Sequence, residues 1–157
     1  MNTNEVRLNF ITRNVVRHFK FLFDKGFNVS NASGFFDSFG NWFVKFESSK
    51  CFLTVLSDRD EVTIRIYPIK ADRKIVIGLK SIIFYLSKGQ TFIGNYQGNL
   101  LWGTRKQLEQ ASKLLEEYID QIIPYMGNEF QRIADDYKLA SEKYLELQIS
   151  TFRGRGY

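Results

Sequence analysis

The sequence contains a single cysteine, Cys51, and a single histidine, His18, among 157 residues. One cysteine excludes an intramolecular disulfide, and the apolar run around it, CFLTVL, predicts a buried and inert thiol. The two residues lack the spacing of a zinc site or of any other site built on His and Cys. We therefore expect neither a resident metal ion nor a cofactor.

Long apolar stretches and phosphate-binding glycine patterns are also missing. No run reaches about 18 apolar residues, the length that a membrane-spanning helix needs, and the N-terminal MNTNEVRLNF lacks the apolar run of a signal peptide. Gly94 and Gly98 belong to neither a G-x-G-x-x-G nor a G-K-[ST] pattern. We expect a soluble, cytoplasmic protein without a membrane partner.

Aromatic side chains are plentiful, with 15 Phe and 8 Tyr. Each buried aromatic removes roughly 150–250 Å² from water, so a modest number of them can build the core of the one domain that a chain of this length suggests. The net charge of +5 is unevenly distributed, with a mild polarity between the two halves of the chain. It does not form the dense basic stripe that is typical of a nucleic-acid-binding protein.

The N-terminal part predicts a helix over residues 3–25, followed by strands. Gly26 directly follows Lys25, which is typical of a helix end. The stripe on one helix face recurs at steps of three and four: Leu8, Ile11, Val15, Phe19 and Leu22. Residues 27–30 can form a short strand, and residues 31–38 are predicted to be a loop.

Three runs of alternating side chains, over 42–47, 51–56 and 62–67, predict a three-stranded antiparallel meander. The third run is expected to bury Val62, Ile64 and Ile66 against the first helix. Between the second and third runs lies Asp58-Arg59-Asp60-Glu61, with three carboxylates in four residues. Catalytic or metal-binding carboxylates need ligands that converge from separate elements, whereas Asp tolerates turn geometry. The charged segment is therefore predicted to be a hairpin turn.

A helix over 75–86 and, from Thr104 onward, either two further helices or one sharply kinked helix complete the expected fold. The break between the last two lies at PYMGN, where Pro124 removes a helical hydrogen bond and Gly127 can end a helix. Each has an apolar seam with a seven-residue repeat: Leu108, Ala111, Leu115, Tyr118, Ile122 and Tyr125, then Phe130, Ile133, Tyr137, Ala140, Tyr144 and Leu147.

The predicted organisation is thus a single α+β domain over 1–149, followed by a flexible basic tail over 150–157. The domain consists of a helix–meander–helix part over 1–103 and a helical part over 104–149. Partner contact or self-association is expected through the last helix, with Tyr137 and Tyr144 as candidate binding residues. Arg153 and Arg155 of the tail are two further candidates.

The stretches Gly26-Phe27, Phe46-Glu47-Ser48 and Asp58-Arg59, with the strand that follows, resemble small bacterial α+β proteins of the toxin-immunity type. The resemblance covers about half of the chain. It implies a non-enzymatic protein that binds another protein, in this case a toxin, and it carries over no catalytic residue.

Two other classes of function stay open at the level of sequence. A nucleic-acid-associated protein would use the basic side chains of the first helix and of the tail, namely Arg7, Arg13, Arg17, Lys20, Arg153 and Arg155. A small enzyme centred on His18 or on the 58–61 turn would need a concave pocket with converging polar groups.

Overall fold

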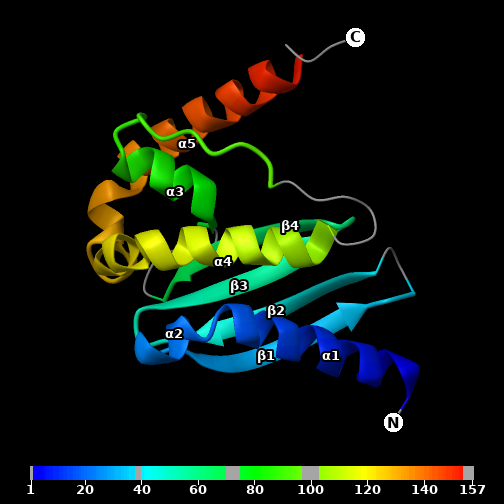
Figure 1. Ribbon diagram of the computed structural model, residues 1–157. Helices are drawn as coiled ribbons and strands as arrows, with labels where there is room; N and C mark the ends of the chain where they lie inside the picture. The colour runs from blue at the N-terminus through cyan, green and yellow to red at the C-terminus, as the bar shows by residue number, and fades with distance from the viewer. Residues whose placement is uncertain (1, 38–39, 70–74, 97–102, 154–157) are drawn as a thin grey trace.

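The computed structural model describes residues 2–37, 40–69, 75–96 and 103–153. The predicted α+β class is confirmed, but the sheet has five strands and not three. The strands are antiparallel and follow one another in chain order, β1-β2-β3-β4-β5. Helices α1 and α4 cover one face of this sheet, and α3 and α5 lie beyond its β4–β5 edge (Figure 1).

The first helix, α1 (Thr3–His18), ends earlier than the sequence pattern predicts. The side chain of Asn2 caps its start and accepts a hydrogen bond from the Glu5 N–H, while Glu5 accepts one from the Asn2 N–H. After a turn at Phe19, a short helix α2 (Phe21–Asp24) follows. Gly26, with φ +81°, ends this part as expected. The break lets the chain bury both Phe19 and Leu22 completely.

Four strands of seven or eight residues form most of the sheet: β1 (Asn28–Phe35), β2 (Asn41–Glu47), β3 (Cys51–Asp58) and β4 (Glu61–Pro68). The prediction of a loop over 31–38 is wrong, because most of that segment belongs to β1. This strand is polar and exposed, with a bulge between Val29 and Asn31. Its extended form is therefore imposed by pairing with β2 rather than by an apolar pattern of its own.

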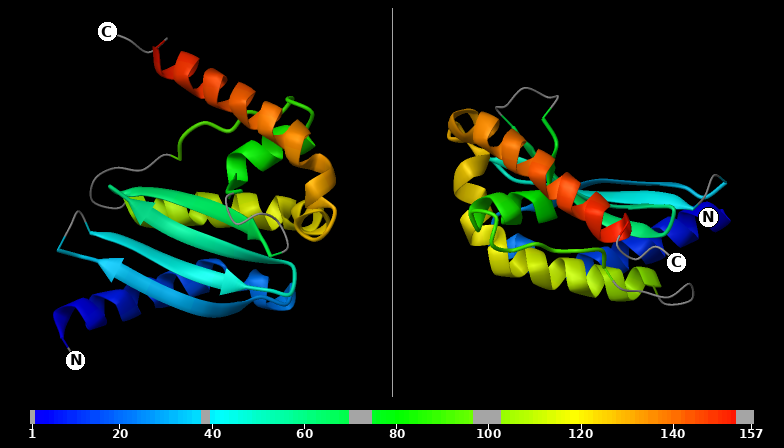
Figure 2. Two further views of the ribbon diagram at one scale, coloured as in Figure 1. Left: turned by 180° about the vertical axis from the view of Figure 1, so that it is seen from behind. Right: turned by 90° about the horizontal axis from the view of Figure 1, so that it is seen from above.

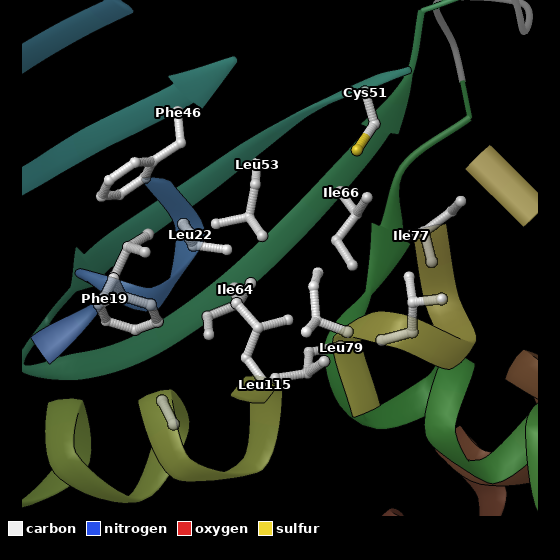
Figure 3. Close-up of a cluster of buried hydrophobic side chains, with 14 of the residues drawn as sticks. Phe19, Leu22, Phe46, Cys51, Leu53, Ile64, Ile66, Ile77, Leu79 and Leu115 are labelled. Carbon is white, nitrogen blue, oxygen red and sulfur yellow. The ribbon is translucent and has the colours of Figure 1, made fainter. Parts of the chain in front are cut away.

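Val62, Ile64 and Ile66 are buried as predicted, but mainly against a different helix. The helix packed on β4 is α4 (Gly103–Ile122), whereas α1 lies over β1 and β2. Figure 3 shows Leu115 of α4 close to Ile64, with Phe19 and Leu22 beside them. The N-terminal and C-terminal halves of the chain thus share one core.

The C-terminal half contains β5 (Ile77–Gly78), α3 (Leu79–Leu86), a 3-10 turn η1 (Ile123–Met126) and α5 (Phe130–Arg153). The predicted break near PYMGN is confirmed. The start of the helix predicted over 75–86 is instead the short strand β5. Helix α5 packs against α3 and does not form a hairpin with α4 (Figure 2). It continues to Arg153, into the segment expected to be a tail, and residues 154–157 lie outside the described part. Within the described residues, no helix is long and apolar enough to cross a membrane.

Cys51 is buried as predicted, with 1% of its surface exposed, and burial raises the pKa of its thiol from 9.0 to about 11. The folded state therefore holds this proton more tightly than the unfolded chain does. The stability that this difference in pKa contributes is fully present below the thiol pKa of the unfolded chain. It is lost as the pH rises through the thiol pKa of the folded protein. Relative to a Cys51→Ala variant, the wild-type free energy of unfolding should fall by about 2 kcal/mol between about pH 8.5 and about pH 10.5. Urea titrations of both proteins at the two pH values measure this, and a constant difference would contradict it.

Candidate functional site

One face of the sheet is covered by none of the described helices, and this open face is turned towards the viewer in the left panel of Figure 2. Side chains alternate along each strand, so every second residue of β2, β3 and β4 points to this face. The inward set is buried, whereas the outward set is half-buried or exposed. The open face is therefore a large surface whose side chains can contact a partner molecule.

Pairing between neighbouring strands arranges the open face in rows, because residues directly opposite each other share a face. The apolar row has Phe43 and Leu56 at its centre, between Ser33 and Thr63. The basic row contains Lys45, Thr54 and Arg65, and the aromatic row contains Phe52 and Tyr67. Along β3 the three rows follow one another as Leu56, Thr54 and Phe52.

These rows line a shallow groove with a volume of about 860 Å³. Its floor is mostly apolar and aromatic: Phe35, Phe43, Phe52, Leu56, Tyr67 and Ile75. Phe35 at one end keeps 59% of its surface exposed. A contiguous apolar surface of this kind on the outside of a fold is characteristic of interaction sites.

The two cations of the basic row have little to bind within the described part of the chain. The Nζ of Lys45 lies 3.8 Å from the centroid of the Phe52 ring, a cation–π contact. The side chain of Arg65 is exposed. Neither forms an ion pair among the described residues. Both cations are therefore available to an incoming anionic group.

The charged 58–61 segment is the hairpin turn that the sequence predicts, with Asp58 paired to Glu61. Arg59 and Asp60 both have positive φ, the conformation of a two-residue turn between antiparallel strands. Asn41 accepts a hydrogen bond from the Arg59 N–H and donates one to Asp58. Among the described residues, no group of three His, Cys, Asp or Glu side chains is placed to hold a metal ion.

A residue of α4 fixes the other side of the same turn. Gln107 is 9% exposed, and its Oε1 accepts a hydrogen bond from the Val62 N–H at 2.8 Å. Its Nε2 donates to the Asp60 carbonyl at 2.9 Å. The carboxylates of the turn are thus part of a fixed hairpin at the border of the open face.

A second hollow, of about 430 Å³, lies between β4, α3 and α5. The Lys80 Nζ lies there, 3.9 Å from the centroid of the Tyr96 ring. Burial lowers the pKa of Lys80, and the negative charge of Glu61 acts in the opposite direction. Glu61 and Glu142 also line this hollow, so its charges are mixed and select no ligand class.

The two tyrosines predicted to bind a partner make contacts within the chain. The Tyr137 hydroxyl lies 2.8 Å from Ser81 Oγ and accepts a hydrogen bond from the Gly78 N–H. The Tyr144 hydroxyl donates to the Ile93 carbonyl at 2.6 Å, and burial raises its pKa to about 12. The Arg153 side chain and the whole of Arg155 lie outside what the structure describes.

His18 and the basic side chains of α1 lie on the helical layer, away from the open face. Burial and the neighbouring Arg17 lower the pKa of His18, while Glu109 of α4 acts to raise it. Neither hollow described above is lined by His18. The Arg7 guanidinium lies 4.7 Å from the centroid of the Phe36 ring. These side chains do not extend the basic row.

Sequence reasoning did not single out Lys45, Arg65 or the aromatic side chains around them as a site. The strand sequences do contain a sign of an apolar outer face. Phe43, Phe52 and Leu56 alternate along their strands with inward residues that are equally apolar. Comparison of the chain with protein-family models, with curated proteins and with solved structures found no match. The described residues form a two-layer α+β protein in which the helices cover one face of the sheet.

Proposed function

We propose that this chain is a non-enzymatic protein-binding protein that docks its partner on the open face of the sheet. The observation that carries the proposal is the groove of half-exposed aromatic and aliphatic side chains around the basic row. Aromatic residues and Arg are enriched in the cores of protein interfaces, where Lys and Glu are depleted. The groove is lined by several aromatic residues and by Arg65, so its composition is closer to that of an interface core than to that of an ordinary solvated surface.

The size of the open face also suits a protein partner. Four strands of seven or eight residues span about 25 Å along the strands and about 19 Å across them. The footprint, on the order of 500 Å², approaches the roughly 800 Å² of accessible surface that each partner buries in a standard interface. A partner that covered the groove and its border would therefore bury an area near the lower end of the range for specific interfaces.

A nucleic acid is a poorer occupant of this surface. A polyphosphate needs several cations along its path, and among the described residues the groove is lined by two, Lys45 and Arg65, with Asp58 beside them. Glu47 and Glu61 add carboxylates at the borders of the same face. A second copy of the chain fits poorly as well, because two-fold pairing of the face would bring the two basic rows together.

An immunity-like role towards a bacterial toxin is one version of this proposal. The basic row then requires a toxin surface that carries carboxylates, since like charges across an interface are unfavourable. Helix α5 offers a second contact surface, where Leu139, Leu145 and Ile149 are about half exposed. Self-association through this helix is a separate proposal, which light scattering tests directly.

Selection from a random peptide library displayed on phage tests the docking surface. Wild-type protein should enrich peptides whose affinity drops by about tenfold or more in a Leu56→Glu variant, because the substitution places a charge in the apolar row. Leu56 points outward, so the variant should keep its fold, as circular dichroism would verify. Phe10→Glu is the matched control, since Phe10 is an exposed apolar residue of α1 with 69% of its surface accessible.

Two results of this selection would overturn the proposal. One is the absence of any enriched peptide. The other is a set of peptides that bind the Leu56→Glu variant as well as they bind wild type. Micromolar binding of single-stranded oligouridine that is lost in a Lys45→Glu variant would replace the protein partner with a nucleic acid.

A further inference from the structure

In the described strands the backbone N–H and C=O groups lie in the plane of the sheet, and the central strands use them for pairing with their neighbours. Strand β2 pairs with β1 and β3, and β3 pairs with β2 and β4, whereas β4 pairs with β3 along its length and with β5 at Arg65 and Ile66. A polypeptide segment laid on this face must therefore satisfy its own N–H and C=O groups. A helix does so within itself, whereas an extended segment would find free backbone partners only at the edge of the sheet.

The spacing of the rows matches the spacing of side chains on a helix. Successive rows along β3, at Leu56, Thr54 and Phe52, lie two residues apart and are therefore about 6.8 Å from one another. On a helix aligned with the strands, side chains at i, i+4 and i+8 share a face and lie about 6.0 Å apart. Three consecutive contact positions of such a helix would thus fall over the apolar, basic and aromatic rows.

The positive charge of the basic row determines which side chain a docked helix needs at its middle contact position, i+4. Lys45 and Arg65 lie on β2 and β4, so their backbones are two strand spacings or about 9.6 Å apart, with Thr54 between them. A single carboxylate above Thr54 would therefore lie between two cations, neither of which has an ion-pair partner among the described residues. The Thr54 hydroxyl is an additional donor at that point.

We infer that the partner's docking segment is an amphipathic helix that carries a carboxylate at i+4, between apolar or aromatic residues at i and i+8. This inference rests on the proposed function and names the chemistry of the partner. The apolar residues at i and i+8 would cover Phe43 with Leu56 and Phe52 with Tyr67. The carboxylate would replace the Phe52 ring as the nearest partner of the Lys45 ammonium.

Two synthetic helical peptides of about 16 residues test the inference. Both carry Leu at i and Phe at i+8 on an alanine-based helix, and they differ only in Glu or Lys at i+4. Fluorescence anisotropy at low salt should show the Glu peptide binding wild-type protein about tenfold more tightly than the Lys peptide. In a Lys45→Glu, Arg65→Glu double variant the order of affinities should reverse. A Lys45→Gln, Arg65→Gln variant, which adds no new charge, should bind both peptides alike.

The inference is overturned if wild type binds the two peptides equally, binds neither, or if the double variant keeps the preference for Glu. Failure of the proposed function looks different, because the phage selection would then return no peptide that depends on Leu56. Peptides that do depend on Leu56 but lack a carboxylate leave the proposed function in place and reject the helix chemistry. A wild-type dimer that the double variant dissociates would assign the face to a second copy of the chain and reject both.

Discussion

Replacing Ile64 by glutamate is expected to unfold the domain. Ile64 is 2% exposed, in the core that the sheet, α4 and Phe19 share (Figure 3). The substitution removes a buried aliphatic side chain and puts a carboxylate where the surrounding side chains are apolar. Loss of burial and the desolvation of an unpaired charge together cost about 5 kcal/mol or more. Because domains of this size have about 5–15 kcal/mol of net stability, the folded state should be largely lost.

The adjacent residue provides a control for this prediction. Thr63 precedes Ile64 on β4 and points to the open face, so Thr63→Glu should change the free energy of unfolding by about 1 kcal/mol or less. Circular dichroism with urea titration compares the two variants and wild type. An Ile64→Glu protein with the wild-type midpoint would mean that the two faces of the sheet have been assigned the wrong way round.

Replacing Tyr137 by aspartate is the second substitution with a large expected effect. Its ring is 5% exposed and lies 6.0 Å from the Phe130 ring and 6.2 Å from the Tyr85 ring, measured between centroids. Truncating a buried aromatic costs about 3–5 kcal/mol, and a buried carboxylate adds to this loss. The α3–α5 contact should open, and the urea midpoint should fall steeply.

Milder substitutions separate the ring from the hydroxyl. Tyr137→Phe keeps the ring, removes the hydroxyl with its hydrogen bonds to Gly78 and Ser81, and should cost about 1–2 kcal/mol. Lys138→Asp, at the next and exposed position of α5, is the control for a new carboxylate. Light scattering of wild type completes the experiment. A wild-type dimer that becomes a folded monomer on Tyr137→Asp would place this tyrosine in an interface between copies.

The sequence predicted those elements whose local chemistry decides their conformation. Asp58 and Asp60 tolerate turn geometry, so the β3–β4 hairpin followed from residue type alone. Pro124 and Gly127 separate α4 from α5 because one removes a hydrogen bond and the other can end a helix. The alternation of Val62, Ile64 and Ile66 indicated burial of that face. It did not indicate which helix would cover the face, because periodicity carries no information about the partner.

The elements that were missed depend on contacts between distant residues. Strand β1, with the sequence NVSNASGF, has no apolar alternation, and only its pairing with β2 makes it a strand. The seam of α5 packs against α3, which precedes it by more than 40 residues, and not against its neighbour α4. The open face escaped prediction for a related reason. Phe43 and Leu56 are as apolar as the core residues Val44 and Val55, so the sequence of each strand does not tell the two faces apart.

The way in which the β3–β4 turn is held has a consequence for folding during synthesis. Arg59 and Asp60 adopt positive φ without a glycine, and for Arg59 this costs roughly 1–2 kcal/mol, so the isolated hairpin is a poor nucleus. Its tip is fixed by Asn41, 18 residues before Arg59, and by Gln107, 47 residues after Asp60. Contacts between residues this far apart in the sequence form slowly, because the entropy cost of closing a long loop comes before their stabilising energy. A nascent chain that ends before α4 should therefore stay only partly folded. Its sheet residues should be accessible to chaperones until Gln107 has emerged from the ribosome.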